Sequence, residues 1–211
     1  MDVLLIGQFD SPFVRRVAIA LTLYELPFEH KPWSVWANAD ELSQVNPLRR
    51  VPALVLDDGE CLIESSAILD ALDELVGPER ALIARDGGER RRALRICALG
   101  TGINDKAVSW FYEKLLREQP SAVWTERCKQ QIRDALRALE AERARAPGDW
   151  FGPRLGHADI AVACMWRFLH EVHPGAFDPA QSPHLLEHAE RCEALPVFAS
   201  IVQPFSVAIS R

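Results

Sequence analysis

The sequence predicts a small α/β domain joined to an all-helical domain, and two observations support this division. Apolar and β-branched runs typical of strands alternate with helical spacing over residues 1–77, whereas residues 89–211 carry helical patterns alone. Between them, residues 78–88 are dominated by turn formers and charged residues, so we place a linker there. A chain of 211 residues accommodates one large domain or two small ones.

The first half of the α/β domain is an alternating strand–helix unit. Residues 3–6 are a short apolar run that reads as a central strand. Apolar residues at helical spacing follow and predict a helix from Pro12 to about Tyr24. A weaker strand is expected at residues 28–31, and a short helix at residues 40–45 ends before Asn46-Pro47.

The second half of this domain is a hairpin that leads into a helix. An Asp-Gly turn at residues 58–59 separates two apolar runs, 53–56 and 60–63, which is a strong hairpin signal because both turn residues must accept positive φ. A helix is expected to open at Glu64-Ser65. The βαβ unit followed by a ββα unit is the thioredoxin-like order and implies a mixed sheet with helices on both faces.

The second domain is expected to be helical throughout. Its helical patterns are bounded by Pro or Gly residues, which stop helices. The expected helices cover residues 89–117, 121–145, 157–171, 183–192 and a short piece at 196–201.

Composition excludes several classes of protein. The net charge of -6 argues against a nucleic-acid partner, because phosphate binding favours a basic surface. The sequence has no apolar run of about eighteen residues that would span a membrane. Its start lacks the basic region and the cleavage site of a signal peptide. The five cysteines are scattered without a CxxC, which fits a reducing, cytoplasmic location.

Two pairs of histidines have the spacing of possible metal ligands. His170 and His173 form an HxxH, but this motif alone has a high false-positive rate and Pro174-Gly175 ends the helix at once. His184 and His188 lie one helical turn apart and are expected to be exposed. We therefore expect no metal site.

Three short motifs, in order along the chain, resemble the glutathione S-transferase family. They are Ser11-Pro12-Phe13 at the start of the first helix, Val51-Pro52 before the hairpin and Glu64-Ser65 after it. The resemblance extends over essentially the whole chain, because the family joins a thioredoxin-like domain to a helical one. It is closer to the serine-type bacterial members than to the tyrosine-type members.

A fourth motif of the family lies at residues 155–160. There the family opens a buried helix with a Ser or Thr cap and an Asp at the third helical position. Asp159 can reach back to the N–H of the cap residue. The cap departs from the pattern because it is Gly156, and this costs only a few tenths of a kcal/mol relative to Ser or Thr.

The resemblance implies that Ser11 is catalytic, since relatives carry their catalytic Ser or Cys at the tip of the first helix. Its hydroxyl would donate a hydrogen bond that keeps the glutathione thiol ionised. The resemblance also implies a cis peptide bond at Pro52, a main-chain pairing between Val51 and the cysteinyl residue, and contacts of Glu64 and Ser65 with the γ-glutamyl end. The glutathione-binding residues expected in all are Phe13, Arg50, Val51, Pro52, Glu64 and Ser65.

The same residues also have purely structural interpretations. Ser11-Pro12 is the preferred helix cap followed by the preferred first helical residue. Glu64-Ser65 is common at helix starts, and Arg49 and Arg50 also fit as solvated loop charges. Serine at position 11 argues against a dehydroascorbate or disulfide reductase, which usually needs a cysteine there.

The resemblance implies a cytoplasmic glutathione S-transferase that uses glutathione as a co-substrate. Its thiolate would attack a small hydrophobic electrophile, as in detoxification. A homodimer is expected, packed through the helix at 64–75 and the first long helix. The alternatives are a glutathione-dependent isomerase or peroxidase, or a non-catalytic scaffold module of the same fold.

Overall fold

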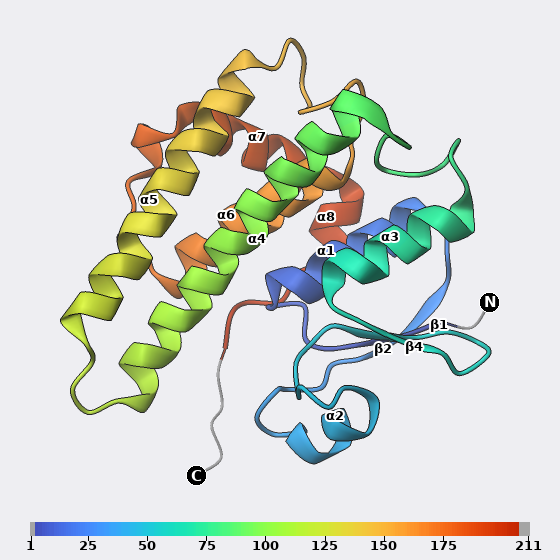
Figure 1. Cartoon of the computed structure of the whole chain (residues 1–211), viewed down its shortest axis with the longest axis horizontal. Coiled ribbons are helices and arrows are strands. Elements are labelled where there is room, and N and C mark those ends of the chain that lie inside the picture. Colours follow the sequence, from blue (N-terminus) through green and yellow to red (C-terminus); the bar gives the residue numbers. More distant parts are fainter. Residues whose placement is uncertain (1–2, 207–211) are drawn as a thin grey trace. The chain divides into compact units, whose positions relative to one another are not determined.

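The computed structural model describes residues 3–206 and separates them into two compact units (Figure 1). Residues 3–85 and 195–206 form the first unit, and residues 86–194 form the second. The chain therefore leaves the first unit once and returns to it near its C-terminal end.

A mixed four-stranded sheet is the base of the first unit. Its strand order is β2-β1-β3-β4, with β1 parallel to β2 and antiparallel to β3. This topology confirms the thioredoxin-like prediction. The strands are β1 (Val3–Ile6), β2 (Phe28–Lys31), β3 (Ala53–Val55) and β4 (Cys61–Ile63).

Helices cover both faces of this sheet, as predicted (Figure 1). Helices α1 (Pro12–Leu23) and α3 (Ser65–Val76) pack together on one face, and α2 (Ala39–Val45) lies on the other. Leu42 of α2 is fully buried in one cluster with Ile6 and Ala53 of the sheet. Helix α8 (Pro196–Ser200) packs against α1.

The turns that follow α3 are held on the first unit by a buried tyrosine. The Tyr24 hydroxyl donates to the carboxylate of Asp73, and the same carboxylate oxygen accepts the N–H of Leu82 at 2.9 Å. Arg80 donates to the carbonyl of Tyr24. Because Tyr24 and Asp73 are both buried, these bonds fix residues 80–82 to α1 and α3.

The second unit is helical, as predicted. Helix α6 is buried along most of its length, which is the pattern of a central helix. Ion pairs from Arg92 and Arg95 of α4 to Glu142 of α5 join these two helices. Within residues 3–206, no helix is long and apolar enough to cross a bilayer. The elements are α4 (Gly87–Leu116), α5 (Ala122–Arg145), α6 (His157–Val172), the 3-10 turn η1 (Pro179–Gln181) and α7 (Pro183–Glu193).

The predicted cap of α6 is confirmed. The carboxylate of Asp159 accepts the N–H of Gly156 at 2.9 Å, as the motif requires. Its other oxygen accepts the N–H of Phe151, also at 2.9 Å. One buried carboxylate therefore fixes both the start of α6 and the loop that precedes it.

Candidate functional site

Gly7, the residue after β1, lies between α1 and the loop that contains Val51 and Pro52. It has a φ of +129°, a conformation that side chains disfavour. A Cβ at this position would lie 2.5 Å from Cγ2 of Val14 and 2.8 Å from Cβ of Val51. The end of β1 therefore runs directly between α1 and the Val51-Pro52 loop, and only glycine leaves room for this approach.

Ser11 is the N-cap of α1, and Pro12 is its first helical residue. The Ser11 Oγ accepts the N–H of Val14 at 3.5 Å, which is long for a capping bond. A serine hydroxyl has one proton to donate besides its acceptor lone pairs. Capping therefore leaves the proton of Ser11 available to a partner beside the helix tip, so the structural and catalytic interpretations are compatible.

The Val51-Pro52 peptide bond is cis. Among residues 3–206, no hydrogen bond engages the main-chain N–H or C=O of Val51. Asn46, which is buried, shapes the preceding loop: its side chain donates to the carbonyl of Arg50 at 2.7 Å and accepts the N–H of Leu48 at 3.0 Å. The Val51 main chain thus offers one donor and one acceptor beside the tip of α1.

Glu64 immediately precedes α3 in an unusual conformation, with φ 71° and ψ 119°. Such geometry is costly for a residue other than glycine and occurs preferentially at functional sites. Its side chain is exposed, whereas Ser65, the first residue of α3, is fully buried. The Ser65 hydroxyl donates to the Glu64 carboxylate at 3.4 Å. The pair presents a carboxylate and a helix N-terminus side by side.

A buried arginine that the sequence did not reveal, Arg16, supports this pair. Its Nη1 donates to Oγ of Ser65 at 3.3 Å and to Oγ of Ser66 at 3.4 Å. A guanidinium and a helix N-terminus both attract anions. With Glu64 as the adjacent acceptor for an ammonium group, this end of the site matches an amino acid that carries both charges.

Two further predicted residues flank these groups in sequence. Phe13 is half-buried on α1, and Arg50 is exposed on the loop before Val51. Arg49, by contrast, forms an ion pair with Asp40 at 3.1 Å in which both side chains are exposed. Exposed pairs of this kind contribute little to stability, so Arg49 is a surface residue.

A polar cluster in the second unit has the composition of a catalytic triad but not its chemistry. Nε2 of His188 lies 3.7 Å from Asp159 and 3.6 Å from the Cys192 sulfur. Burial raises the pKa of the Cys192 thiol far above its usual range and lowers the pKa of His188 to about 4. A buried neutral thiol is no nucleophile, so the cluster is structural.

The expected exposure of His188 is wrong, because its side chain is fully buried. It lies edge-on to the rings of Trp150 and Phe151, which shield it from water. His184, one turn earlier, is exposed as expected and contacts Glu140 at 2.6 Å. Over residues 3–206, no group of three or more His, Cys, Asp or Glu side chains is arranged to hold a metal ion.

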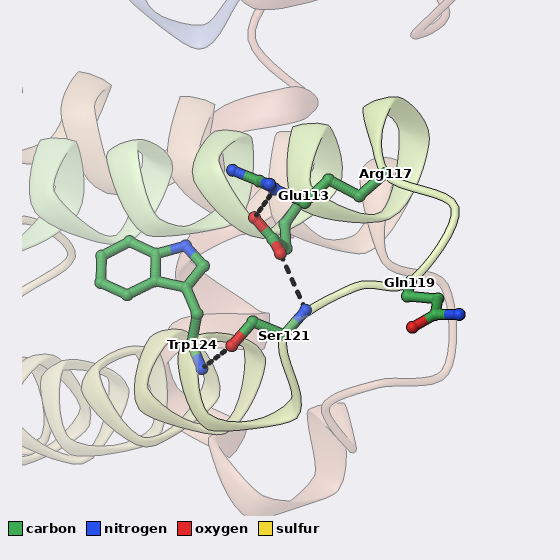
Figure 2. Close-up of a pocket in the computed structure, with 5 residues that line it drawn as sticks. All are labelled: Glu113, Arg117, Gln119, Ser121 and Trp124. Carbon is green, nitrogen blue, oxygen red and sulfur yellow. Dashed lines mark hydrogen bonds and ion pairs between the residues drawn. The ribbon is translucent and has the colours of Figure 1, made fainter.

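A pocket of about 490 Å³ lies at the α4–α5 turn and contains no predicted site residue. Figure 2 shows the hydrogen bonds among its polar groups. The Glu113 carboxylate accepts from Arg117 and from the Ser121 N–H, and the Ser121 hydroxyl accepts the N–H of Trp124. These bonds shape the turn. The lining residues are Glu113, Arg117, Gln119, Ser121 and Trp124.

The first unit defines the class of protein: a thioredoxin-like sheet with a cis-proline loop beside the first helix. A model of the glutathione S-transferase N-terminal domain matches residues 5–80, and a model of the family's C-terminal domain matches residues 122–191. The chain belongs to the glutathione S-transferase family, as the motifs predicted.

Individual relatives agree with this assignment. The uncharacterized GST-like protein YibF of Escherichia coli (strain K12) is 32% identical over 95% of this chain and 98% of its own. A glutathione S-transferase from Methylobacterium radiotolerans in complex with glutathione sulfonate is 34% identical, with a TM-score of 0.90 over 100% of this chain and 99% of its own. A family member from Pseudomonas fluorescens Pf-5 with bound glutathione is 33% identical, with a TM-score of 0.86 over 96% and 100% of the two chains.

Proposed function

We propose that the protein is a serine-type glutathione transferase in which Ser11 keeps the thiol of bound glutathione ionised. The observation that carries this proposal is the close approach of Gly7 to both Val14 of α1 and Val51, which supports a main-chain docking edge near the start of the helix that Ser11 caps. The thiolate attacks a carbon of a small hydrophobic electrophile, so that a carbon–sulfur bond forms while the bond to a leaving group breaks and the leaving group departs with its electron pair. Two similar structures, with glutathione or its sulfonate bound, support the choice of thiol.

The energetics of a single hydroxyl are sufficient for this role. Lowering a thiol pKa of about 8.5 by about two units requires about 2.7 kcal/mol of preference for the charged form. A hydrogen bond to a charged acceptor contributes about 1.5 to 3 kcal/mol. The N-terminus of α1 adds roughly 0.3 to 1 kcal/mol. Ser11 thus acts as a donor, and the attacking sulfur belongs to glutathione.

Each of the remaining site residues binds a different part of glutathione in this proposal. The main chain of Val51, next to Pro52, pairs with the cysteinyl residue. Glu64 receives the γ-glutamyl ammonium group, and the buried Ser65 with the start of α3 receives the α-carboxylate. In addition, Arg50 faces the glycyl carboxylate, and Phe13 borders the site from α1.

Replacing Ser11 tests the function, with Ser121 as a matched control. Both serines cap helices through their hydroxyls, at 3.5 Å for Ser11 and 3.2 Å for Ser121. Each change to alanine should therefore cost about 1 kcal/mol of stability. Only Ser11→Ala should raise the apparent pKa of the rate, by about one to two units, and lower turnover with a generic aromatic electrophile. Glutathione should still bind in calorimetry.

Each part of the proposal would be contradicted by a different result. An unchanged pH profile in Ser11→Ala removes the role of Ser11. If wild-type protein gives no heat with glutathione and is not retained on immobilised glutathione, a scaffold module is the better description. Turnover without a conjugated product, with a substrate that merely isomerises or with a peroxide, would indicate an isomerase or peroxidase.

We also propose that the protein works as a homodimer packed through α3 and α4. Each of these helices carries an exposed leucine: Leu75 of α3 is 48% exposed and Leu94 of α4 is 46% exposed. In the proposed dimer, the partner subunit would cover both side chains. Analytical ultracentrifugation tests the assembly, and a monomer at micromolar concentration would contradict it.

We propose a cytoplasmic location, and the state of the cysteines supports it. All five are free, and Cys61 is the one among them that is not buried. Proteins of oxidising compartments usually pair their cysteines. Fractionation of cells that express the protein tests this assignment.

A further inference from the structure

The C-terminal part of the first unit lies against the loop that carries Ser11. The side-chain oxygen Oε1 of Gln203 accepts the N–H of Phe9 at 3.1 Å. The carboxylate of Asp10 accepts the N–H of Ser206 at 3.3 Å. These two contacts join the two residues before Ser11, Phe9 and Asp10, to residues almost two hundred positions away in sequence.

Helix α1 itself fixes this segment in place. Arg15 is buried, and its guanidinium donates to the carbonyl of Ile201 at 2.7 Å and to that of Phe198 at 3.0 Å. Phe198 and Ile201 are buried as well. Hydrogen bonds from a charged donor are about twice as strong as neutral ones. Gln203 therefore lies only two residues after Ile201, whose carbonyl is held by Arg15.

The loop is held on its other side by β2. The His30 ring stacks on the Phe9 ring, with centroids 3.8 Å apart and planes at 4°. Its Nε2 contacts the carbonyl of Gly7 at 2.7 Å. The N–H of Ser11 donates to the carbonyl of Gln8 at 3.1 Å, which closes the loop into a turn. The loop from Gly7 to Ser11 is thus held by contacts with both His30 and Gln203.

We propose that Gln203 is a positioning residue that sets the place of the Ser11 hydroxyl. This inference rests on the proposed function. The capping bond of Ser11 is long, at 3.5 Å, so α1 by itself holds the hydroxyl weakly. The main chain before Ser11 decides where the hydroxyl lies, and that main chain is fixed at Phe9 by Gln203. Displacements of even about 1 Å at a reacting centre are costly.

The identity of the side chain makes the inference testable without a change of charge. An N–H can be bound only by an acceptor, so the amide oxygen of Gln203 is the functional atom. Methionine has a similar shape and lacks that acceptor, whereas glutamate keeps it. Gln203→Met leaves the side chains of Asp10, Arg15 and His30 around the loop unchanged. A shifted pH profile in this variant therefore reports a change of geometry.

The test compares Gln203→Met with Gln131→Met, the same change at an exposed position of α5. In Gln203→Met, the apparent pKa of bound glutathione, read from ultraviolet thiolate absorbance, should rise by about 0.5 to 1 unit. The kcat near neutral pH should fall about 3- to 10-fold, while KM for glutathione stays within about twofold. Gln131→Met should match the wild type.

Hydrogen exchange without glutathione separates the two proposals. Protection of the Phe9 N–H should fall about 3- to 10-fold in Gln203→Met and return in Gln203→Glu. Unchanged protection, or lost protection with an unchanged thiol pKa, overturns the positioning role. If the wild type gives no heat with glutathione, the proposed function fails, and exchange at Phe9 alone then decides whether Gln203 holds the loop.

Discussion

Arg16 of α1 donates a hydrogen bond to the Ser65 hydroxyl at the first turn of α3. The same helix begins at the Ser11 cap, so one rigid element carries the proposed thiol donor and the support of the proposed carboxylate site. Helix α1 packs directly on α3, which keeps the two helix starts in a fixed relation. The spacing between the proposed thiol donor and the proposed carboxylate site is therefore set by α1 and its packing on α3.

Arg16→Lys should weaken glutathione binding. A lysine ammonium is a compact charge on a flexible stem, and it cannot reproduce the planar guanidinium whose Nη1 reaches both Ser65 and Ser66. Loss of one charged hydrogen bond predicts a Kd about tenfold higher by calorimetry. Arg137→Lys, on the exposed surface of α5, is the control and should bind normally. Equal affinity in the two variants would contradict this role of Arg16.

Gly7→Ala should disrupt the junction between α1 and the Val51 loop. The new Cβ meets Val14 and Val51 at distances that real side chains do not tolerate, and the backbone is in a region that favours glycine. We expect a loss of about 2 to 4 kcal/mol in urea unfolding and weaker glutathione binding. Gly102→Ala is the matched control, because it lies in α4 with open space around it and should stabilise by about 1 kcal/mol.

A Gly7→Ala protein with wild-type stability would show that the loop moves aside freely. The arrangement described here would then be one of several of similar energy. In that case, glutathione affinity should also be unchanged.

Local chemistry was predictable from the sequence, and distant packing was not. The Asp159 cap and the Asp-Gly hairpin depend on residues a few positions apart, so spacing alone indicates them. The predicted positive φ at both turn residues is wrong for Asp58, because Gly59 alone of the two has one. The bond from Phe9 to Gln203 joins the two ends of the chain, and no periodicity encodes it. His188 looked like a solvated residue because the sequence does not show that aromatic rings and Asp159 enclose it.

Asp159→Ala should lower stability and leave catalysis intact. The carboxylate binds the N–H groups of Phe151 and Gly156, both at 2.9 Å, in buried surroundings. Each buried donor left without a partner costs about 1 to 3 kcal/mol, so we expect a clearly lower Tm. The folded fraction should keep normal kcat and KM. Lost turnover at unchanged Tm would show that Asp159 has another role.

The pH dependence of stability should come largely from His173, because the other histidine with a lowered pKa, His188, is compensated. Burial raises the pKa of Asp159 to about 6 and lowers the pKa of His188 to about 4. Between about pH 4 and pH 6, Asp159 and His188 together hold one proton in the folded protein, and it is on Asp159. In the unfolded chain the two groups also hold one proton, and it is on His188. The number of bound protons is the same, so this pair contributes little slope.

His173 has no such partner. Its ring stacks on Trp110 with centroids 3.6 Å apart, and its Nε2 contacts the carbonyl of Ala107 at 3.0 Å. Burial, with smaller contributions from the charges of Lys114 and Lys129, lowers the pKa of His173 to about 4. The folded protein therefore keeps this ring neutral where an unfolded chain would protonate it.

His173→Phe should flatten the fall in stability on acidification. Between pH 6.5 and about 4, the unfolded wild type binds one more proton than the folded state, so its stability falls as the pH falls through this window. The loss amounts to at most about 3 kcal/mol. Phenylalanine keeps the stacking on Trp110 and does not titrate. Urea unfolding at several pH values should therefore show a shallower dependence of the unfolding free energy on pH. The missing hydrogen bond should lower that free energy by the same amount at every pH. Parallel curves for the two proteins would place the titrating group elsewhere.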